Sequence, residues 1–193
     1  MVSQSQKPFV LWFTGLSGAG KSTIATAVGQ KISEINDRVY LLDGDGVRKG
    51  LCADLTFTDS DRDENIRRVS EVAKLMVDSG FIVLAAFITP KHSHRQQARD
   101  KFQQGGFIEV FVDTAFEECE KRDIKGLYKK ARSGGIKNFT GIDSQYERPN
   151  TSEIHIKTDG INVEQCVSQI FNYLYSKEYL KHQVSKIDIT SYV

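Results

Sequence analysis

Short apolar runs alternate along the chain with longer stretches that mix hydrophobic and polar residues. Five of these runs have the length and the β-branched and aromatic content of strands: Phe9–Thr14, Val39–Leu42, Phe81–Ile88, Phe107–Val112 and Ile154–Lys157. Several are apolar without interruption, which is typical of strands that are covered on both faces.

The stretches between these runs have the pattern of helices, with apolar residues recurring every three or four positions. They predict helices at Lys21–Ile35, Asp59–Ser79, Ser93–Gln104, Ala115–Arg122 and Val163–Tyr175. Strands and helices that alternate through short connections favour a mainly parallel sheet with right-handed crossovers. The pattern therefore predicts one doubly wound, three-layer α/β/α domain over residues 1–193.

One long segment breaks this alternation. Residues 126–149 are basic, contain glycines and show weak periodicity. A loop of this length in a compact domain is commonly functional. We therefore interpret Gly126–Pro149 as a mobile lid with few apolar anchors. The tail at 176–193 predicts no element.

Composition and charge exclude several kinds of protein. The 193 residues carry 26 basic and 25 acidic side chains, so the overall charge favours neither nucleic acid nor a membrane surface as a partner. The longest apolar run is far shorter than the roughly 20 residues that a membrane helix needs. The three cysteines lack metal-ligand spacing and predict ordinary packing in a reduced, cytoplasmic protein. His92 and His94 are interpreted as solvated loop residues.

The first motif with a chemical meaning follows the first predicted strand. Residues 15–22 read GLSGAGKS, which fits the phosphate-binding loop G-x-x-x-x-G-K-S/T between a strand and a helix. Its glycines permit a tight turn whose backbone N–H groups face phosphates. Lys21 is expected to reach the β- and γ-phosphates, and the Ser22 hydroxyl to ligate Mg²⁺ directly. The predicted ATP-binding residues are Gly15, Leu16, Ser17, Gly18, Ala19, Gly20, Lys21, Ser22 and Thr23.

Two carboxylates end the second predicted strand, in the sequence LDGD. Ligands of open parallel sheets bind at the carboxyl ends of the strands. Asp43 is therefore expected to act on Mg²⁺ through water, and Asp45 to orient or deprotonate an attacking hydroxyl. The alternative is an Asp-Gly turn that only ends the strand, but the neighbouring phosphate loop favours the functional interpretation.

Residues suited to binding an anion follow at once. Arg48, Arg62 and Asn65 come directly after the carboxylates, and the planar fork of arginine matches phosphate and sulfate oxygens. Arg62 and Asn65 share one face of the predicted helix because they lie three residues apart. Arg67 and Arg68 are interpreted as solvated surface charges.

Longer matches now indicate a family. Between Phe9 and Thr158 the chain resembles the adenylylsulfate kinases (APS kinases), through GLSGAGKST, LDGDGVRKGL, DLTFTDSDRDENIRR, AAFITP, FIEVFVDT, CEKRDIKGLYKKAR and IKNFTGIDSQYERP. The resemblance implies a P-loop NTPase-type fold and a homodimer. It implies that the chain phosphorylates the ribose 3′-hydroxyl of adenylylsulfate (APS) with ATP and Mg²⁺. The products would be 3′-phosphoadenylylsulfate (PAPS) and ADP, in sulfate assimilation.

The resemblance also assigns roles by motif. The catalytic residues would be Lys21, Asp43, Asp45 and Thr89. The APS-binding residues would be Asp45, Arg48, Phe57, Arg62, Asn65, Ile88, Thr89, Lys137 and Phe139, with the two phenylalanines on either side of the adenine. Cys119 and Arg122 resemble positions that approach the adenine of ATP.

One departure concerns Thr89, which stands where the family commonly has a serine discussed as a phosphoenzyme residue. Threonine keeps the hydroxyl, and we expect direct transfer to the acceptor, with Thr89 at most positioning substrate.

Three alternatives stay open at this stage. A kinase of the same fold could act on another nucleotide or on a sugar acid, and a P-loop protein could bind nucleotide as a sensor without turnover. The chain could also be a kinase domain from a fusion with ATP sulfurylase. The N-terminal Met and the tail favour a stand-alone chain.

Overall fold

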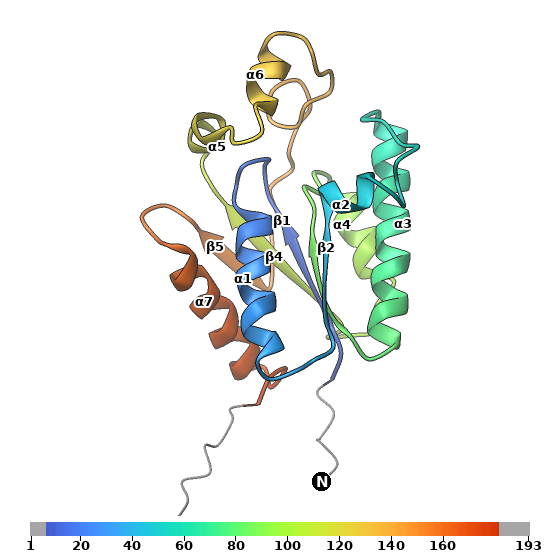
Figure 1. Cartoon of the computed structure of the whole chain (residues 1–193), viewed down its shortest axis with the longest axis vertical. Coiled ribbons are helices and arrows are strands. Elements are labelled where there is room, and N and C mark those ends of the chain that lie inside the picture. The colour runs from blue at the N-terminus through green and yellow to red at the C-terminus, as the bar shows by residue number, and fades with distance from the viewer. Residues whose placement is uncertain (1–6, 182–193) are drawn as a thin grey trace, which may run out of the picture.

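The centre of the fold is a sheet of five strands, each parallel to its neighbours (Figure 1). The computed structural model describes residues 7–181. Its strands are β1 Val10–Thr14, β2 Val39–Asp43, β3 Ile82–Ala86, β4 Phe107–Asp113 and β5 Ile154–Lys157, in the spatial order β2-β3-β1-β4-β5. The five predicted strands are confirmed. Because they are parallel, their carboxyl ends meet at one edge, which is where such sheets bind ligands.

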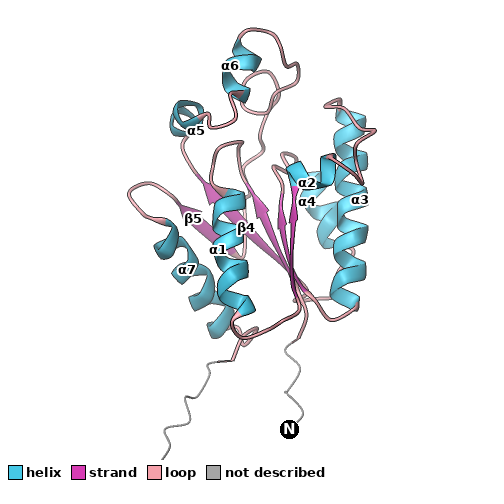
Figure 2. Ribbon diagram, viewed as in Figure 1, coloured by secondary structure: helices cyan, strands magenta, loops and turns pink. Residues whose placement is uncertain are grey.

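Helices cover both faces of this sheet (Figure 2). One face carries α1 (Lys21–Ser33) and α7 (Val163–Ser176), and the other carries α3 (Asp59–Asp78) and α4 (His92–Arg99). Successive side chains of β1 point to opposite faces. Leu11 therefore packs with the first helix pair and Trp12 with the second, and both are fully buried. Burial on both faces explains the uninterrupted apolar run and confirms the three-layer architecture.

Three short helices lie at the carboxyl edge: α2 (Gly44–Arg48), α5 (Phe116–Arg122) and α6 (Leu127–Arg132) (Figure 1). The sequence predicted only α5. Helix α2 begins because the Asp43 side chain accepts a hydrogen bond from the Asp45 backbone N–H, with an N···O distance of 3.0 Å. Helix α6 begins after Gly126, whose φ is +64°. Neither is long enough to show a hydrophobic period. Helix α4 ends at Arg99, five residues before its predicted end.

The segment Gly126–Pro149, called the lid segment below, is better anchored than the sequence predicted. Tyr128 is 1% exposed and Phe139 is 8% exposed, and their rings meet edge to face at 5.0 Å between centroids. Both belong to the apolar cluster on the α1 side of the sheet. The prediction of few apolar anchors was therefore wrong, and the mobility of the lid segment stays a prediction.

The prediction for His94 was also wrong. It lies in α4 rather than in a loop, is 2% exposed, and its Nε2 atom contacts the carboxylate of Asp63 on α3. His92 is exposed at the start of the same helix. Burial of the three unpaired cysteines confirms their prediction as packing residues. Within residues 7–181, no helix combines the length and the apolar character needed to span a membrane.

The packing of α7 predicts a contrast between two leucines. Leu174 on α7 is fully buried, whereas Leu75 on α3 is 66% exposed. Leu174→Ala should lower the free energy of unfolding by about 2–5 kcal/mol because it leaves a cavity. Leu75→Ala should change it by less than about 0.5 kcal/mol. Urea unfolding of both variants measures the difference, and equal effects would contradict the packing of α7.

Candidate active site

The loop between β1 and α1, residues 15–20, has the shape of a phosphate-binding loop and is called the phosphate cradle below. Gly15, Gly18 and Gly20 have φ values of +149°, +76° and +103°, which glycine adopts without a steric penalty. A Cβ atom at Gly15 would lie 2.5 Å from the carbonyl oxygen of Val112 on β4. Glycine is therefore required at that position by space as well as by conformation.

Lys21 opens α1 and is 8% exposed. Its Nζ atom donates to the carbonyl oxygens of Gly15 at 3.0 Å and Leu16 at 2.7 Å. Burial lowers the pKa of Lys21 to about 8, and the positive charge of Lys125 lowers it as well, while Asp43 and Asp45 raise it. The ammonium group is thus still protonated at pH 7 and sits inside the loop.

The two carboxylates of β2 and α2 lie beside this loop. The Ser22 hydroxyl donates to Asp43, and Asp43 also caps α2 by accepting from the Asp45 backbone. The Asp45 carboxylate is exposed and forms an ion pair with Lys125, between α5 and α6. No motif in the sequence pointed to Lys125. Hydroxyl and carboxylate oxygens are the donors that Mg²⁺ prefers, so Ser22 and Asp43 fit such an ion.

Arg62, near the start of α3, links two segments that are distant in sequence. Its guanidinium donates to the carbonyl oxygen of Phe57 at 3.1 Å, to the Thr140 hydroxyl at 2.8 Å and to the carbonyl oxygen of Asn138. Arg48 lies over the Phe57 ring, with 4.3 Å from its guanidinium carbon to the ring centroid. The structure thereby brings Arg48, Phe57 and Arg62 together with the part of the lid segment that contains Phe139.

The remaining predicted acceptor residues differ in exposure. Asn65 is 6% exposed, and its side-chain Nδ2 atom has no hydrogen-bond partner among residues 7–181. Leaving a buried donor without a partner costs free energy. A donor of this kind is commonly one that a bound ligand satisfies. The Phe57 ring is 49% exposed, while Phe139 is largely buried against Tyr128. Lys137 is exposed.

Thr89 follows β3 in a strained conformation. Its φ is +44°, an outlier for a β-branched residue, at a cost of about 1–3 kcal/mol. It is 1% exposed, its hydroxyl accepts from the indole N–H of Trp12 at 2.9 Å, and its carbonyl accepts from Arg95 at 2.8 Å. Sequence reasoning missed both partners, because Trp12 has the pattern of a core residue and Arg95 that of a helix surface. The carbonyl of the preceding Ile88 accepts from the Thr14 hydroxyl at 2.7 Å.

The predicted ATP side contains one further link that the sequence did not reveal. The Tyr128 hydroxyl of α6 donates to the carbonyl oxygen of Ser17 at 2.9 Å, which ties the lid segment to the phosphate cradle. Cys119 is buried, and its backbone carbonyl lies 3.0 Å from where a Cβ atom of Gly18 would be. Arg122 pairs with Glu118 on α5.

Two clefts lie near the carboxyl edge. One, of about 500 Å³, adjoins the phosphate cradle at Leu16 and is bounded by Phe116 and residues 141–146. The other, of about 770 Å³, lies between α4 and residues 149–153 and is lined by none of the predicted site residues. Only the first is next to the predicted chemistry.

A strand, a glycine turn with a buried lysine, and carboxylates at the next strand end define a P-loop phosphotransferase. The model of the adenylylsulphate kinase family matches residues 7–157. The chain belongs to this family, and its activity is the ATP-dependent phosphorylation of adenylylsulfate to PAPS.

Individual relatives agree with this assignment. The adenylyl-sulfate kinase of Marinobacter nauticus is 55% identical over 93% of this chain and 90% of its own length. That of Vibrio parahaemolyticus is 57% identical, over 89% and 83%. The APS kinase of Mycobacterium tuberculosis, solved with AMPPNP and APS, is 45% identical, with a TM-score of 0.83 over 87% of this chain and 98% of that one. A gluconokinase of Sinorhizobium meliloti is 15% identical at a TM-score of 0.56, which shows a shared fold alone.

The burial of Thr89 generates a prediction about its hydroxyl. The Thr89 hydroxyl is buried and accepts a hydrogen bond from Trp12. We therefore expect this hydroxyl to support the backbone and not to carry the phosphoryl group. Thr89→Ala should keep kcat within about tenfold, whereas loss of a covalent nucleophile costs orders of magnitude. Intact-mass measurement during turnover should find no phosphothreonine. A phosphothreonine that forms and decays at the turnover rate would contradict this expectation.

Proposed function

We propose that ATP binds at the phosphate cradle and that adenylylsulfate binds between α3 and the lid segment, on opposite sides of Asp43 and Asp45. The contact that carries this proposal is the Ser22–Asp43 hydrogen bond, which joins the cradle to the end of β2. The unpartnered Nδ2 donor of Asn65 supports an acceptor site on the α3 side.

The proposed reaction is an in-line attack of the ribose 3′-hydroxyl on the γ-phosphoryl group. Lys21 and the backbone N–H groups of residues 15–22 would stabilise the negative charge of the transferring group. Asp45 would orient the hydroxyl or accept its proton. Its carboxylate is exposed and paired with Lys125, and substrate would have to replace that ion pair.

Mg²⁺ would be held by the Ser22 hydroxyl directly and by Asp43 through water, and would supply positive charge between the phosphates. The Asp43 carboxylate points at Ser22, which supports this placement.

The anion-binding part of the acceptor site would consist of Arg48, Arg62 and Lys137, with the adenine between Phe57 and Phe139. Ile88 and Thr89 would line its floor. On the donor side, Cys119 and Arg122 would approach the adenine of ATP. Closure of the lid segment would exclude water, which otherwise competes as an acceptor.

We also propose a cytoplasmic homodimer, which light scattering on the purified protein measures as a mass of about twice 21.7 kDa. A related APS kinase from Thiobacillus denitrificans, 32% identical, is described as hexameric, so a larger assembly is the outcome that would replace this proposal.

Acceptor-dependent release of ADP tests the proposed function. Adenylylsulfate should support turnover, while AMP, other nucleotides and sugar acids should not. Lys21→Ala should abolish turnover, because its charge meets the transferring phosphoryl group, and cooperative urea unfolding should show that the variant is still folded. Tight ATP binding without turnover on any acceptor would instead support a nucleotide sensor.

A second prediction separates the two substrates. Arg62→Ala should lower kcat/KM for adenylylsulfate about 30-fold or more, with little change in ATP affinity. The reason is that the proposed pair between the Arg62 guanidinium and the anion of adenylylsulfate is lost. Arg62→Lys should recover only part of the loss, since lysine lacks the planar fork. Arg67→Ala on the same helix is the matched control, because Arg67 is exposed and pairs with Glu64. An Arg62→Ala variant that loses ATP affinity and keeps normal adenylylsulfate kinetics would place the acceptor site elsewhere.

A further inference from the structure

Arg95 on α4 is a buried arginine whose contacts converge on the proposed acceptor site. It is 3% exposed. One terminal nitrogen, Nη1, donates to the carbonyl oxygen of Thr89 at 2.8 Å, and the other, Nη2, donates to the carbonyl oxygen of Glu147 at 2.8 Å. A single guanidinium therefore joins the end of β3 to the end of the lid segment.

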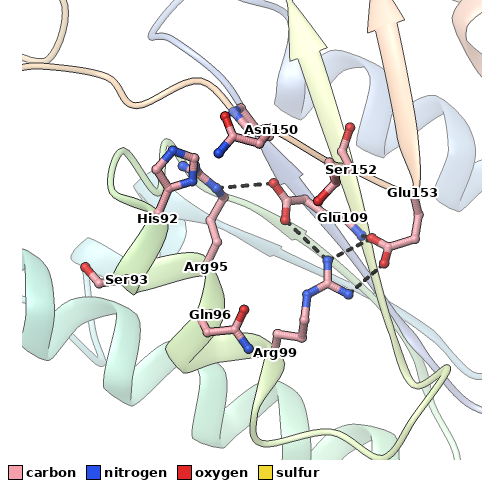
Figure 3. A pocket seen from close by; sticks show the side chains of 11 residues that line it. His92, Ser93, Arg95, Gln96, Arg99, Glu109, Asn150, Ser152 and Glu153 are labelled. Atoms are coloured by element: carbon pink, nitrogen blue, oxygen red, sulfur yellow. Dashed lines mark hydrogen bonds and ion pairs between the residues drawn. The ribbon is translucent and has the colours of Figure 1, made fainter.

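The same guanidinium is fixed from two other directions. Its Nε atom lies 3.2 Å from a carboxylate oxygen of Glu109 on β4, and its Nη2 atom lies 2.8 Å from Nδ1 of His92. Figure 3 shows Arg95 extending from α4 toward Glu109, with Arg99 one turn further along the helix. Glu109 is 4% exposed, and burial raises its pKa. A buried carboxylate beside it holds the arginine in place, because either charge alone would be costly there.

The two carbonyls that Arg95 joins belong to segments that need such support. Thr89 has its unfavourable positive φ, and strain of this kind persists only when surrounding contacts enforce it. Glu147 is paired with the same strand end by a second bond, from its backbone N–H to the carbonyl of Pro90 at 2.8 Å. Arg95 thus supports one backbone conformation at Thr89 and one position of the lid segment at the same time.

We propose that Arg95 is a positioning residue for the acceptor. It sets the backbone at Thr89 and the attachment of the lid segment, without touching either substrate. This inference rests on the proposed function, which places Ile88 and Thr89 at the floor of the adenylylsulfate site. Within residues 7–181, the hydrogen bonds and the ion pair of Arg95 include no residue of the phosphate cradle, so we expect the ATP site not to depend on it.

Arg99 offers a matched control on the same helix. It pairs with Glu109 at 3.3 Å and with Glu153 at 2.7 Å, as Figure 3 shows, but its hydrogen bonds include neither Thr89 nor Glu147. Both arginines pair with the buried carboxylate of Glu109. Only Arg95 should influence the acceptor.

The test compares Arg95→Lys with Arg99→Lys in steady-state kinetics with both substrates varied. Lysine keeps the positive charge beside Glu109 but cannot bridge two carbonyl oxygens with a planar fork. Arg95→Lys should raise the KM for adenylylsulfate about tenfold or more, the effect of losing a hydrogen bond from a charged group. Its KM for ATP should stay within about twofold, and Arg99→Lys should leave both KM values unchanged.

A neutral pair covers the case in which Arg95→Lys does not fold. The double variant Arg95→Gln with Glu109→Gln removes both buried charges together, so neither is left unpaired. It should show the same selective rise in the KM for adenylylsulfate. A normal adenylylsulfate KM in a folded Arg95 variant, or equal changes for both substrates, would overturn the positioning role. Failure of the unaltered protein to use adenylylsulfate would instead overturn the proposed function.

Discussion

The site depends on the hydrogen bonds that hold the buried ammonium group of Lys21 inside the loop. The ammonium group has lost most of its contact with water, and the carbonyl oxygens of Gly15 and Leu16 replace that water at 3.0 and 2.7 Å. Because these carbonyls point inward, the loop can direct backbone N–H groups outward, as an anion site requires. The turn is possible only because Gly15 lets the chain pass against Val112 on β4. The charge, the loop and the central strands therefore form one unit.

The parallel sheet then brings groups from distant parts of the chain to this unit. The ends of β1, β2 and β3 lie at one edge, so Ser22 meets Asp43, and Thr14 meets Ile88. The same arrangement fixes Thr89, whose conformation is unfavourable on its own. Its hydroxyl and carbonyl are both bonded to buried side chains. A rigid strand end is thus obtained from packing rather than from the local preference of the residue.

Local patterns predict the strands, the long helices and the phosphate cradle, because each has a period or a spacing that the sequence displays. They do not predict α2 or α6, which begin at a capping aspartate and a left-handed glycine and are too short for a period. They also fail for His94, which was interpreted as solvated, and they do not point to Arg95; both are buried by partners from other elements. Such pairs depend on tertiary contacts that no local pattern records. Arg48, Arg62 and Asn65 were expected from their chemistry, and the other acceptor residues came from the family resemblance. The structure groups Arg48, Phe57 and Arg62.

Hydrogen bonds of the lid segment reach different parts of the site. Tyr128 bonds to the phosphate cradle, Arg62 bonds to residues 138 and 140, and Glu147 bonds to the end of β3. If Arg62 binds the acceptor as proposed, the anion competes for donors that now hold the lid segment. Acceptor binding and the position of the lid segment are then linked, and such linkage acts equally in both directions.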